Sequence, residues 1–479
     1  MLPFSVARSR LRLTAAPILR KSARNRYSTM GPASSRLRNI AVVCVITTPG
    51  ICYGVAIQDD APYLHSPPAD HWDIEPGPSK EQVTSILSQA AYSFPVKNVP
   101  GVVRYDGAQL ASTNPCEDQF IHGKVPSPWN DDNQWMAWGV FDGHIGVQTA
   151  ALLKEKLLPF VRYSLDQSKS YSGEEMVPDE LVQRAIMKGF MNLDDSIIKE
   201  AHYTSQSEES LPEKVKKLTP AFSGSCALLS MYDPIASTLH VACTGDSRAV
   251  LGYKSRDGQW VAIPLSVDQT GYNESEVARI CAEHPGEENI IEYGRVLGLG
   301  VSRAFGDCEW KWPLDFQTEM QQRFYGPGSI RAIPTPPYVT AEPVVTSTKI
   351  DPGSPSFLII ATDGLWGLLS NEQAVNLVGK WLELRASEQR TDPEPTYEPF
   401  DFGPFWKDMN WKFVEERTTV QDDNAAVHLL RNSLGGNHHE MIAGRLAFTY
   451  PSSRRVRDDM TVQVVFFYND ALMSKDQPK

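Results

Sequence analysis

Short apolar runs alternate with amphipathic segments along the chain from about residue 101. Six runs rich in β-branched and aromatic residues predict strands, at 135–141, 225–232, 238–245, 248–254, 357–364 and 461–467. Apolar positions at helical spacing predict helices, at 147–165, 179–202 and 371–384. Ser79 and Gln82 form a capping box that predicts a further helix start. Grouped strands with long helices between them indicate an α+β fold of sheets packed against helix layers.

The first part of the chain differs in composition from the rest. Residues 1–38 are rich in Arg and Ser and lack acids, which is typical of a mitochondrial transit peptide. Residues 39–58 contain an uncharged apolar run near the lower length limit of an inner-membrane span, although Pro49 and Gly50 interrupt it. The alternative is an apolar part of a leader, with the body free in the matrix.

The remaining boundaries follow from local composition. A Pro-rich stretch predicts a linker, and a Pro-, Glu- and aromatic-rich stretch predicts an insertion within the main domain. The expected divisions are a linker at 59–78, a main domain at 79–470, an inserted loop near 383–412 and a tail at 471–479.

Charge and cysteine content exclude two classes of function. The net charge is −12, yet no acid precedes Asp59, and nine basic residues lie in that stretch. The remainder is therefore strongly acidic, which argues against a nucleic-acid partner because such proteins need a basic surface. The seven cysteines are scattered without a C-x-x-C pair, so neither a zinc site nor a disulfide framework is expected.

Acidic residues lie beside several of the predicted strands. They occur in the five segments Cys-Glu-Asp at 116–118, Phe-Asp-Gly-His at 141–144, Thr-Gly-Asp-Ser-Arg at 244–248, Ala-Thr-Asp-Gly at 361–364 and Arg-Asp-Asp-Met at 457–460. A single acid at a strand end usually caps a turn. Five such segments converging in one cleft would repel one another unless cations neutralised them. Carboxylate oxygens suit Mg²⁺ or Mn²⁺ better than zinc.

Five motifs occur in the order FDGHIG, TGDSRAVLG, VSRAFGD, ATDGLW and RDDMTVQVV. Together they resemble the signature motifs of the type 2C (PPM) family of metal-dependent protein serine/threonine phosphatases. The runs AAYSFPVKNVPGVVRYDGAQLASTNPCED, RAFGDCEWKW and DDNAAVHLLRNSLGGN further resemble the mitochondrial pyruvate dehydrogenase phosphatase branch. The resemblance covers roughly residues 79–468 and implies a β-sandwich of two antiparallel sheets flanked by helices.

The resemblance also implies roles for particular residues. Asp142 would bridge two Mg²⁺ or Mn²⁺ ions, and the carbonyl of Gly143 would be a further ligand. Asp363 and Asp458 would bind the first ion. The remaining assignments are Glu117 and Asp118 at the second ion, largely through water, Asp246 at a weaker third ion, and His144 as the general acid. Bound ions would activate a water against the phosphate, and a histidine titrating near neutrality would protonate the leaving alkoxide.

The chain departs from the family pattern at three positions. Thr113 stands where family members place a phosphate-gripping Arg, which leaves Asn114 as the candidate for that contact. Gln269 replaces a usual His, and Ile145 replaces a usual Gly or Ala. Ser302, Arg303 and Asp307 of VSRAFGD are interpreted as supporting or structural residues.

Three functional hypotheses follow. The leading one is a phosphatase that dephosphorylates and so activates the E1 subunit of the pyruvate dehydrogenase complex. A membrane anchor would instead place the same chemistry in the intermembrane space, on other phosphoproteins. The third is a pseudophosphatase that only binds phosphoproteins, against which the retention of Asp142, Asp363 and Asp458 argues.

Overall fold

The computed structural model describes residues 77–129, 133–172, 177–328, 330–386, 394–404 and 413–467. The predicted transit peptide, membrane span and C-terminal tail, with nearly all of the linker, lie outside this part of the chain. Within the described ranges, no helix is both long enough and apolar enough to cross a membrane.

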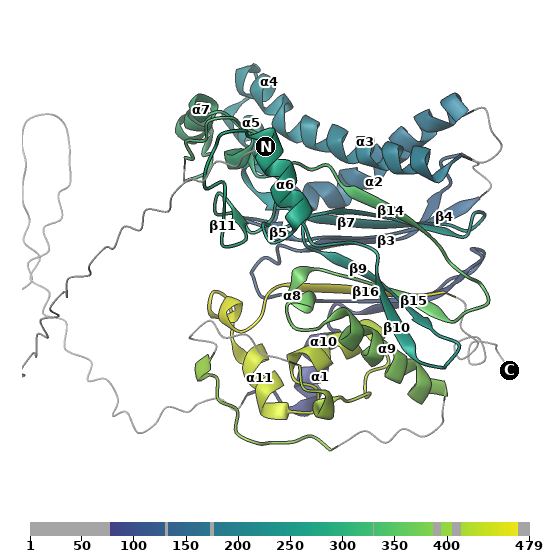
Figure 1. Cartoon of the computed structure of the whole chain (residues 1–479). Helices are drawn as coiled ribbons and strands as arrows, with labels where there is room; N and C mark the ends of the chain where they lie inside the picture. The colour runs from purple at the N-terminus through teal and green to yellow at the C-terminus, as the bar shows by residue number, and fades with distance from the viewer. Residues whose placement is uncertain are drawn as a thin grey trace, which may run out of the picture. The chain divides into compact units, whose positions relative to one another are not determined.

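Two antiparallel sheets form the centre of the domain (Figure 1). The first has the order β1-β2-β16-β15-β9-β10, with strands Tyr92–Pro95, Val102–Leu110, Met460–Phe467, Ser356–Ala361, Arg248–Lys254 and Trp260–Pro264. The second has the order β14-β8-β7-β4-β3, with strands Val344–Lys349, Thr238–Thr244, Ala227–Asp233, Gln134–Phe141 and Gln119–Pro126. A buried cluster that includes Trp138, Leu228, Ile360 and Val465 fills the space between them. The expected sandwich is therefore confirmed.

Helices cover the outer face of each sheet (Figure 1). The helices α2 (Gln148–Ser172), α3 (Asp179–Ile198) and α5 (Leu211–Phe222) share a buried cluster with the five-stranded sheet. The helices α1 (Lys80–Ser88), α9 (Asn371–Ala386), α10 (Ala425–Leu434) and α11 (His439–Ala447) share another with the six-stranded sheet. The layer order is thus helix, sheet, sheet, helix, and both sheets are buried on their two faces.

Shorter elements complete the described fold. They are the helices α4 (Glu200–Gln206), α6 (Glu274–Glu283), α7 (Leu314–Phe324) and α8 (Asp363–Trp366), the 3-10 turns η1 (Cys308–Trp310), η3 (Glu415–Arg417) and η4 (Ser452–Arg455), and the short strands β5 (Gly143–His144), β6 (Gly224–Ser225), β11 (Ile291–Glu292), β12 (Arg295–Val296) and β13 (Phe305–Gly306).

Several predicted boundaries were wrong in detail. The strand expected at 225–232 is divided, since β6 belongs to a small three-stranded sheet with β5 and β13, whereas β7 belongs to the five-stranded sheet. The strand expected at 357–364 ends at Ala361, and α8 follows it. The helix expected to reach 202 ends at Ile198, and α4 continues from Glu200. The helix expected at 371–384 extends to Ala386 as α9.

The sheet order brings several strand ends to one edge of the sandwich. The strands β4, β8 and β15 end shortly before Asp142, Asp246 and Asp363. The strands β3 and β16, which begin after Asp118 and Asp458, are the antiparallel neighbours of β4 and β15. All five acids therefore lie at the same end of the two sheets.

Candidate metal centre

Three carboxylates from different strand ends meet in one cluster. Asp142, Asp246 and Asp363 each offer a carboxylate oxygen, and these oxygens all lie within 4.8 Å of one another. The three residues are far apart in sequence, so the sheets bring them together. Three acids at this spacing form a donor set of hard oxygen ligands, which is the chemistry that Mg²⁺ and Mn²⁺ prefer.

Asp118 lies against this cluster and is almost fully buried, with 1% of its surface exposed. Its Oδ2 accepts hydrogen bonds from Thr362 Oγ1 at 2.9 Å and Thr461 Oγ1 at 2.7 Å. Its Oδ1 is buried and has no hydrogen-bond partner in the described structure. An orphaned carboxylate oxygen at this depth is costly, and a cation or its coordinated water would satisfy it.

Burial and the neighbouring carboxylates also raise the pKa values of these acids. Burial, followed by repulsion from Asp363, raises the pKa of Asp246 to about 7. Burial is also the main cause that raises the pKa of Asp118 to about 8. The pKa of Asp142 is raised by burial and by the carboxylates of Asp363 and Asp118, and burial raises that of Asp363 as well. Burial and mutual repulsion therefore disfavour the charged carboxylates, a cost that divalent cations would offset, and the residues present fit such ions.

Glu117 and Gly143 lie next to each other at the rim of the cluster. Oε1 of Glu117 accepts a hydrogen bond of 2.6 Å from the N–H of Gly146. A Cβ atom on Gly143 would lie 2.4 Å from the backbone oxygen of Glu117, so only glycine fits this position. The two segments that carry predicted ligands are thus packed backbone against backbone.

Asp458 lies just before β16, the strand that pairs with β15, and so reaches the same edge of the sandwich beside Asp363. Its carboxylate forms an ion pair with Arg454. A Cβ atom on Gly364 would lie 2.1 Å from the backbone oxygen of Asp459, which places the Asp363 and Asp458 turns in direct contact. Asp458 is not among the three acids whose oxygens converge within 4.8 Å.

Asn114, the predicted phosphate contact, lies exposed on the turn before Glu117. The preceding residue, Thr113, faces the protein instead: its N–H lies 2.9 Å from Oδ1 of Asp459, and its hydroxyl also donates to that carboxylate. Neither residue supplies a positive charge for a phosphate.

His144 has a partner that the sequence alone did not assign. Its Nε2 lies 2.9 and 3.0 Å from the two carboxylate oxygens of Asp307, whose side chain is only 1% exposed. Burial alone would lower the pKa of His144, but Asp307 outweighs burial and raises it. This arrangement favours a protonated imidazole, the form that a general acid needs.

The side chain of Gln269 supports the turn that carries Asp246. Gln269 accepts a hydrogen bond of 2.7 Å from the N–H of Gly245 and donates one of 3.0 Å to the carbonyl of Cys243. The amide of Gln269 accepts and donates from the same end of its side chain, which a histidine ring could not do for both the Gly245 N–H and the Cys243 carbonyl. Replacement of the usual His by Gln therefore affects how this turn is held. In the sequence, the only indication of this contact was that Gln269 stands in place of the usual His.

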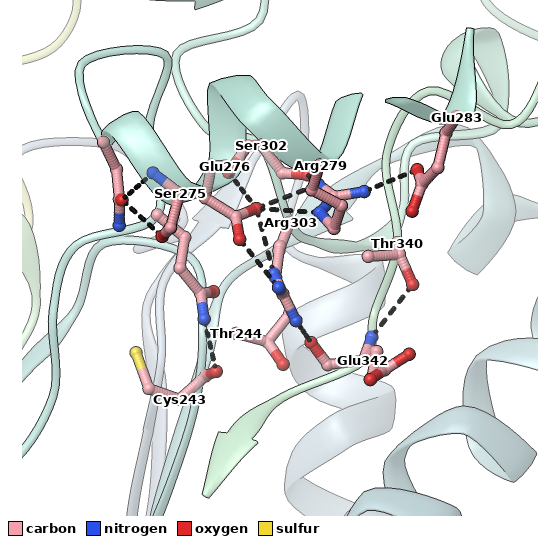
Figure 2. Close-up of polar contacts among 12 residues, drawn as sticks. Cys243, Thr244, Ser275, Glu276, Arg279, Glu283, Ser302, Arg303, Thr340 and Glu342 are labelled. Atoms are coloured by element: carbon pink, nitrogen blue, oxygen red, sulfur yellow. Dashed lines mark hydrogen bonds and ion pairs between the residues drawn. The ribbon is translucent and has the colours of Figure 1, made fainter. Parts of the chain in front are cut away.

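A buried ion-pair network lies behind this turn. Glu276 binds Arg303 through both carboxylate oxygens, at 3.0 and 2.7 Å, and also accepts from Arg279 and Ser302. Arg303 in turn donates to the carbonyl of Glu342 at 2.6 Å. Figure 2 shows Glu276 reaching from α6 to Arg303 and Arg279. The network fixes Ser302 and Arg303, a few residues before Asp307.

Comparison with known proteins agrees with this geometry. The family model described as protein phosphatase 2C matches residues 108–394. A protein phosphatase 2C homolog of Schizosaccharomyces pombe is 42% identical over 374 residues, covering 77% of this chain and 81% of that protein. The chain therefore belongs to the protein phosphatase 2C family.

Two relatives carry a more specific description. The mitochondrial pyruvate dehydrogenase (acetyl-transferring) phosphatase 1 of Saccharomyces cerevisiae is 36% identical over 406 residues, covering 77% of this chain and 69% of that protein. The human protein of the same description is 31% identical over 464 residues, covering 81% of this chain and 82% of that protein.

Proposed function

We propose that this chain is a mitochondrial protein serine/threonine phosphatase that uses two Mg²⁺ or Mn²⁺ ions to dephosphorylate the E1 subunit of the pyruvate dehydrogenase complex. The observation that carries the chemistry is the convergence of Asp142, Asp246 and Asp363, one oxygen each, within 4.8 Å. Family membership supports the reaction class. The named relatives support the substrate and the compartment.

In this proposal Asp142 and Asp363, with the carbonyl of Gly143 and with Asp458, would hold the principal ions. Glu117 and Asp118 would contribute at the second ion, largely through water, and Asp246 would contribute to a weaker third site. Divalent ions, when bound, would activate a water and neutralise charge on the phosphoryl oxygens.

Protonation of the leaving group is assigned to His144, which Asp307 positions. Asp307 keeps the imidazole of His144 oriented through Nε2. The protonated ring donates its proton to the serine or threonine oxygen as the bond to phosphorus breaks. No cysteine is needed as a nucleophile. Burial raises the pKa values of the Cys226 and Cys243 thiols, so both are held as unreactive thiols.

A turnover assay tests the reaction class. Phosphate release from a phosphoserine peptide should require Mn²⁺ and stop with EDTA, and Asp363→Asn should abolish it while the circular dichroism spectrum is unchanged. Equal release with and without EDTA, or full activity of Asp363→Asn, would refute the metal mechanism.

Two further experiments test substrate and compartment separately. Phosphorylated E1 should be turned over at a much higher kcat/KM than a general phosphoprotein such as casein. Equal values of kcat/KM would refute the assignment of E1 as the substrate.

Protease treatment of mitoplasts should leave the protein intact while the inner membrane is intact. Digestion there would favour an intermembrane-space enzyme instead.

A further inference from the structure

The acidic cluster repels a phosphoryl dianion, so binding of the substrate requires positive charge that its carboxylates do not provide. A phosphoryl dianion entering this edge of the sandwich approaches Asp142, Asp246 and Asp363. Divalent ions offset part of the repulsion, but positioning a phosphate usually also takes a side-chain cation, and Arg is the best suited because its planar fork matches phosphate oxygens.

Two other arginines of the described residues near the site, Arg248 and Arg457, make structural contacts. Arg248 is held by both oxygens of Asp268, at 2.8 and 2.6 Å, and by Asn371 at 2.8 Å. Its guanidinium also stacks over the ring of Trp366. Arg457 donates to the backbone oxygens of Phe448 and Ala111, and so ties the segment before β16 to the turn after β2.

Arg454 is placed differently. Its guanidinium pairs with Asp458, and the two side chains are 44% and 40% exposed, so the pair faces solvent at the rim of the cluster. The charge of Arg454 also reaches Asp363, where it opposes the rise in the pKa of that carboxylate. Arg454 is therefore an exposed arginine at the rim of the cluster, where it pairs with one predicted metal ligand and interacts electrostatically with another.

The base of Arg454 is fixed although its head is exposed. It lies in η4, where the neighbouring Ser453 is fully buried. The hydroxyl of Ser453 donates to the carbonyl of Ser112 at 2.5 Å, and its own carbonyl accepts the N–H of Arg457 at 3.0 Å. The short helix therefore anchors the arginine to the turn that leads to Glu117.

We propose that Arg454 is the side chain that grips the phosphoryl group of the substrate. In the metal-free protein its guanidinium is the counter-charge of Asp458. With Asp458 serving as a metal ligand, as proposed above, the guanidinium would be free of this ion pair at the same edge, where its N–H groups would bind two phosphoryl oxygens. This inference rests on the proposed phosphatase reaction and adds the residue that recognises the phosphate.

The test compares Arg454→Gln with Arg455→Gln, which removes the same charge from the same short helix. Inorganic phosphate is titrated into each Mn²⁺-loaded protein by calorimetry. Arg454→Gln should weaken phosphate binding by about 10- to 100-fold, the range expected for one charge-assisted bidentate pair, while Arg455→Gln stays close to wild type. The KM for a phosphopeptide should rise by a similar factor, with a smaller change in kcat.

A second measurement separates phosphate recognition from metal binding. Free Mn²⁺ followed by electron paramagnetic resonance should show that Arg454→Gln binds Mn²⁺ at least as tightly as wild type, because a competitor for Asp458 is gone. Weaker Mn²⁺ binding, or equal phosphate affinity in the two variants, would overturn the role of Arg454. A wild-type protein without metal-dependent turnover would refute the proposed function instead, and the phosphate titration would still decide the role of Arg454.

Discussion

Nε2 of His144 lies between the two carboxylate oxygens of Asp307, 2.9 and 3.0 Å away. The two residues are 163 positions apart in the chain, and the small sheet of β5, β6 and β13 brings them together. A Cβ atom on Gly224 would lie 2.1 Å from the imidazole and 2.3 Å from Asp307 Oδ1, so a glycine in β6 makes room for the contact.

Asp307→Asn should therefore impair proton donation more than any other step. With a neutral partner the pKa of His144 falls, and less of the imidazole is protonated. We expect kcat for a phosphoserine peptide to fall by about 100-fold, within the usual contribution of general acid catalysis. Hydrolysis of p-nitrophenyl phosphate should fall far less, because p-nitrophenolate leaves without a proton.

The matched control is Asp315→Asn, which removes an exposed carboxylate eight residues later. Its rates with both substrates should stay at the wild-type level. If Asp307→Asn slowed both substrates by the same factor, Asp307 would act on the metal site or the fold and not through the proton of His144.

The sequence could predict that acids from separate segments come together because strand ends are marked locally. Asp142, Asp246 and Asp363 each follow a strongly apolar strand, and acids at one edge of a sandwich converge when the sheets pack. The central strands and long helices were predictable for the same reason. The helices α5, α6 and α7 were not predicted.

Pairings across the sheets could not be predicted in this way. The contact of Asp307 with His144, that of Gln269 with Gly245 and that of Asp459 with Thr113 all depend on how separate loops meet. No local periodicity encodes such contacts. The sequence indicated only a supporting or structural role for Ser302, Arg303 and Asp307. It gave no indication of the ion pair between Arg454 and Asp458.

Glu276 allows a prediction about stability and pH. Burial alone would raise its pKa, but hydrogen bonds from Arg303, Arg279 and Ser302 outweigh burial and lower the pKa from 4.5 to about 2. A depressed folded-state pKa stabilises the protein fully above the unfolded value, and this stabilisation is lost as the pH falls from 4.5 towards about 2.

Glu276→Gln should lower the free energy of unfolding at neutral pH by about 3 kcal/mol, because it leaves Arg303 buried without its counter-charge. The difference from wild type should narrow as the pH falls below 4.5. Urea unfolding at several pH values measures both effects. The control Glu283→Gln removes the exposed partner of Arg279 and should change stability by less than about 1 kcal/mol. A gap between wild type and Glu276→Gln that widens in acid would contradict the pKa assignment.

Two neighbouring acids should respond differently to the same substitution. The Asp459 carboxylate is buried and accepts from the N–H groups of Ser112, Thr113 and Glu117 and from the Thr113 hydroxyl. Asp459→Asn places an amide donor against these donors, and we expect a loss of about 2 kcal/mol in metal-free stability. Mn²⁺ affinity should also fall by about 10-fold or more, because the turn before Asp118 loosens.

Asp458→Asn is the matched comparison for Asp459→Asn. It removes only a half-exposed ion pair with Arg454, so metal-free stability should change by less than about 1 kcal/mol, while activity is lost. Urea unfolding in EDTA and Mn²⁺ titration give the two readouts. Equal destabilisation by both variants would mean that Asp459 does not anchor the turn.

Ile145 adopts a backbone conformation that its side chain disfavours. Its φ is 57°, in the left-handed region, and 62% of its surface is exposed, so little packing compensates for the strain. Such a conformation costs an L-residue about 1–2 kcal/mol, and Asn tolerates it better than a β-branched residue. Ile145→Asn should therefore raise the free energy of unfolding by about 1 kcal/mol, measured by urea unfolding in EDTA.

The control for Ile145 is Ile235→Asn, at a residue that is 66% exposed and is not among the residues with positive φ. It should leave stability within about 0.5 kcal/mol of wild type, as surface substitutions usually do. An equal gain in both variants would indicate a general benefit of replacing exposed isoleucine. A loss at Ile145 would show that its side chain makes a stabilising contact that outweighs the strain, and the turn after His144 would then depend on isoleucine for its shape.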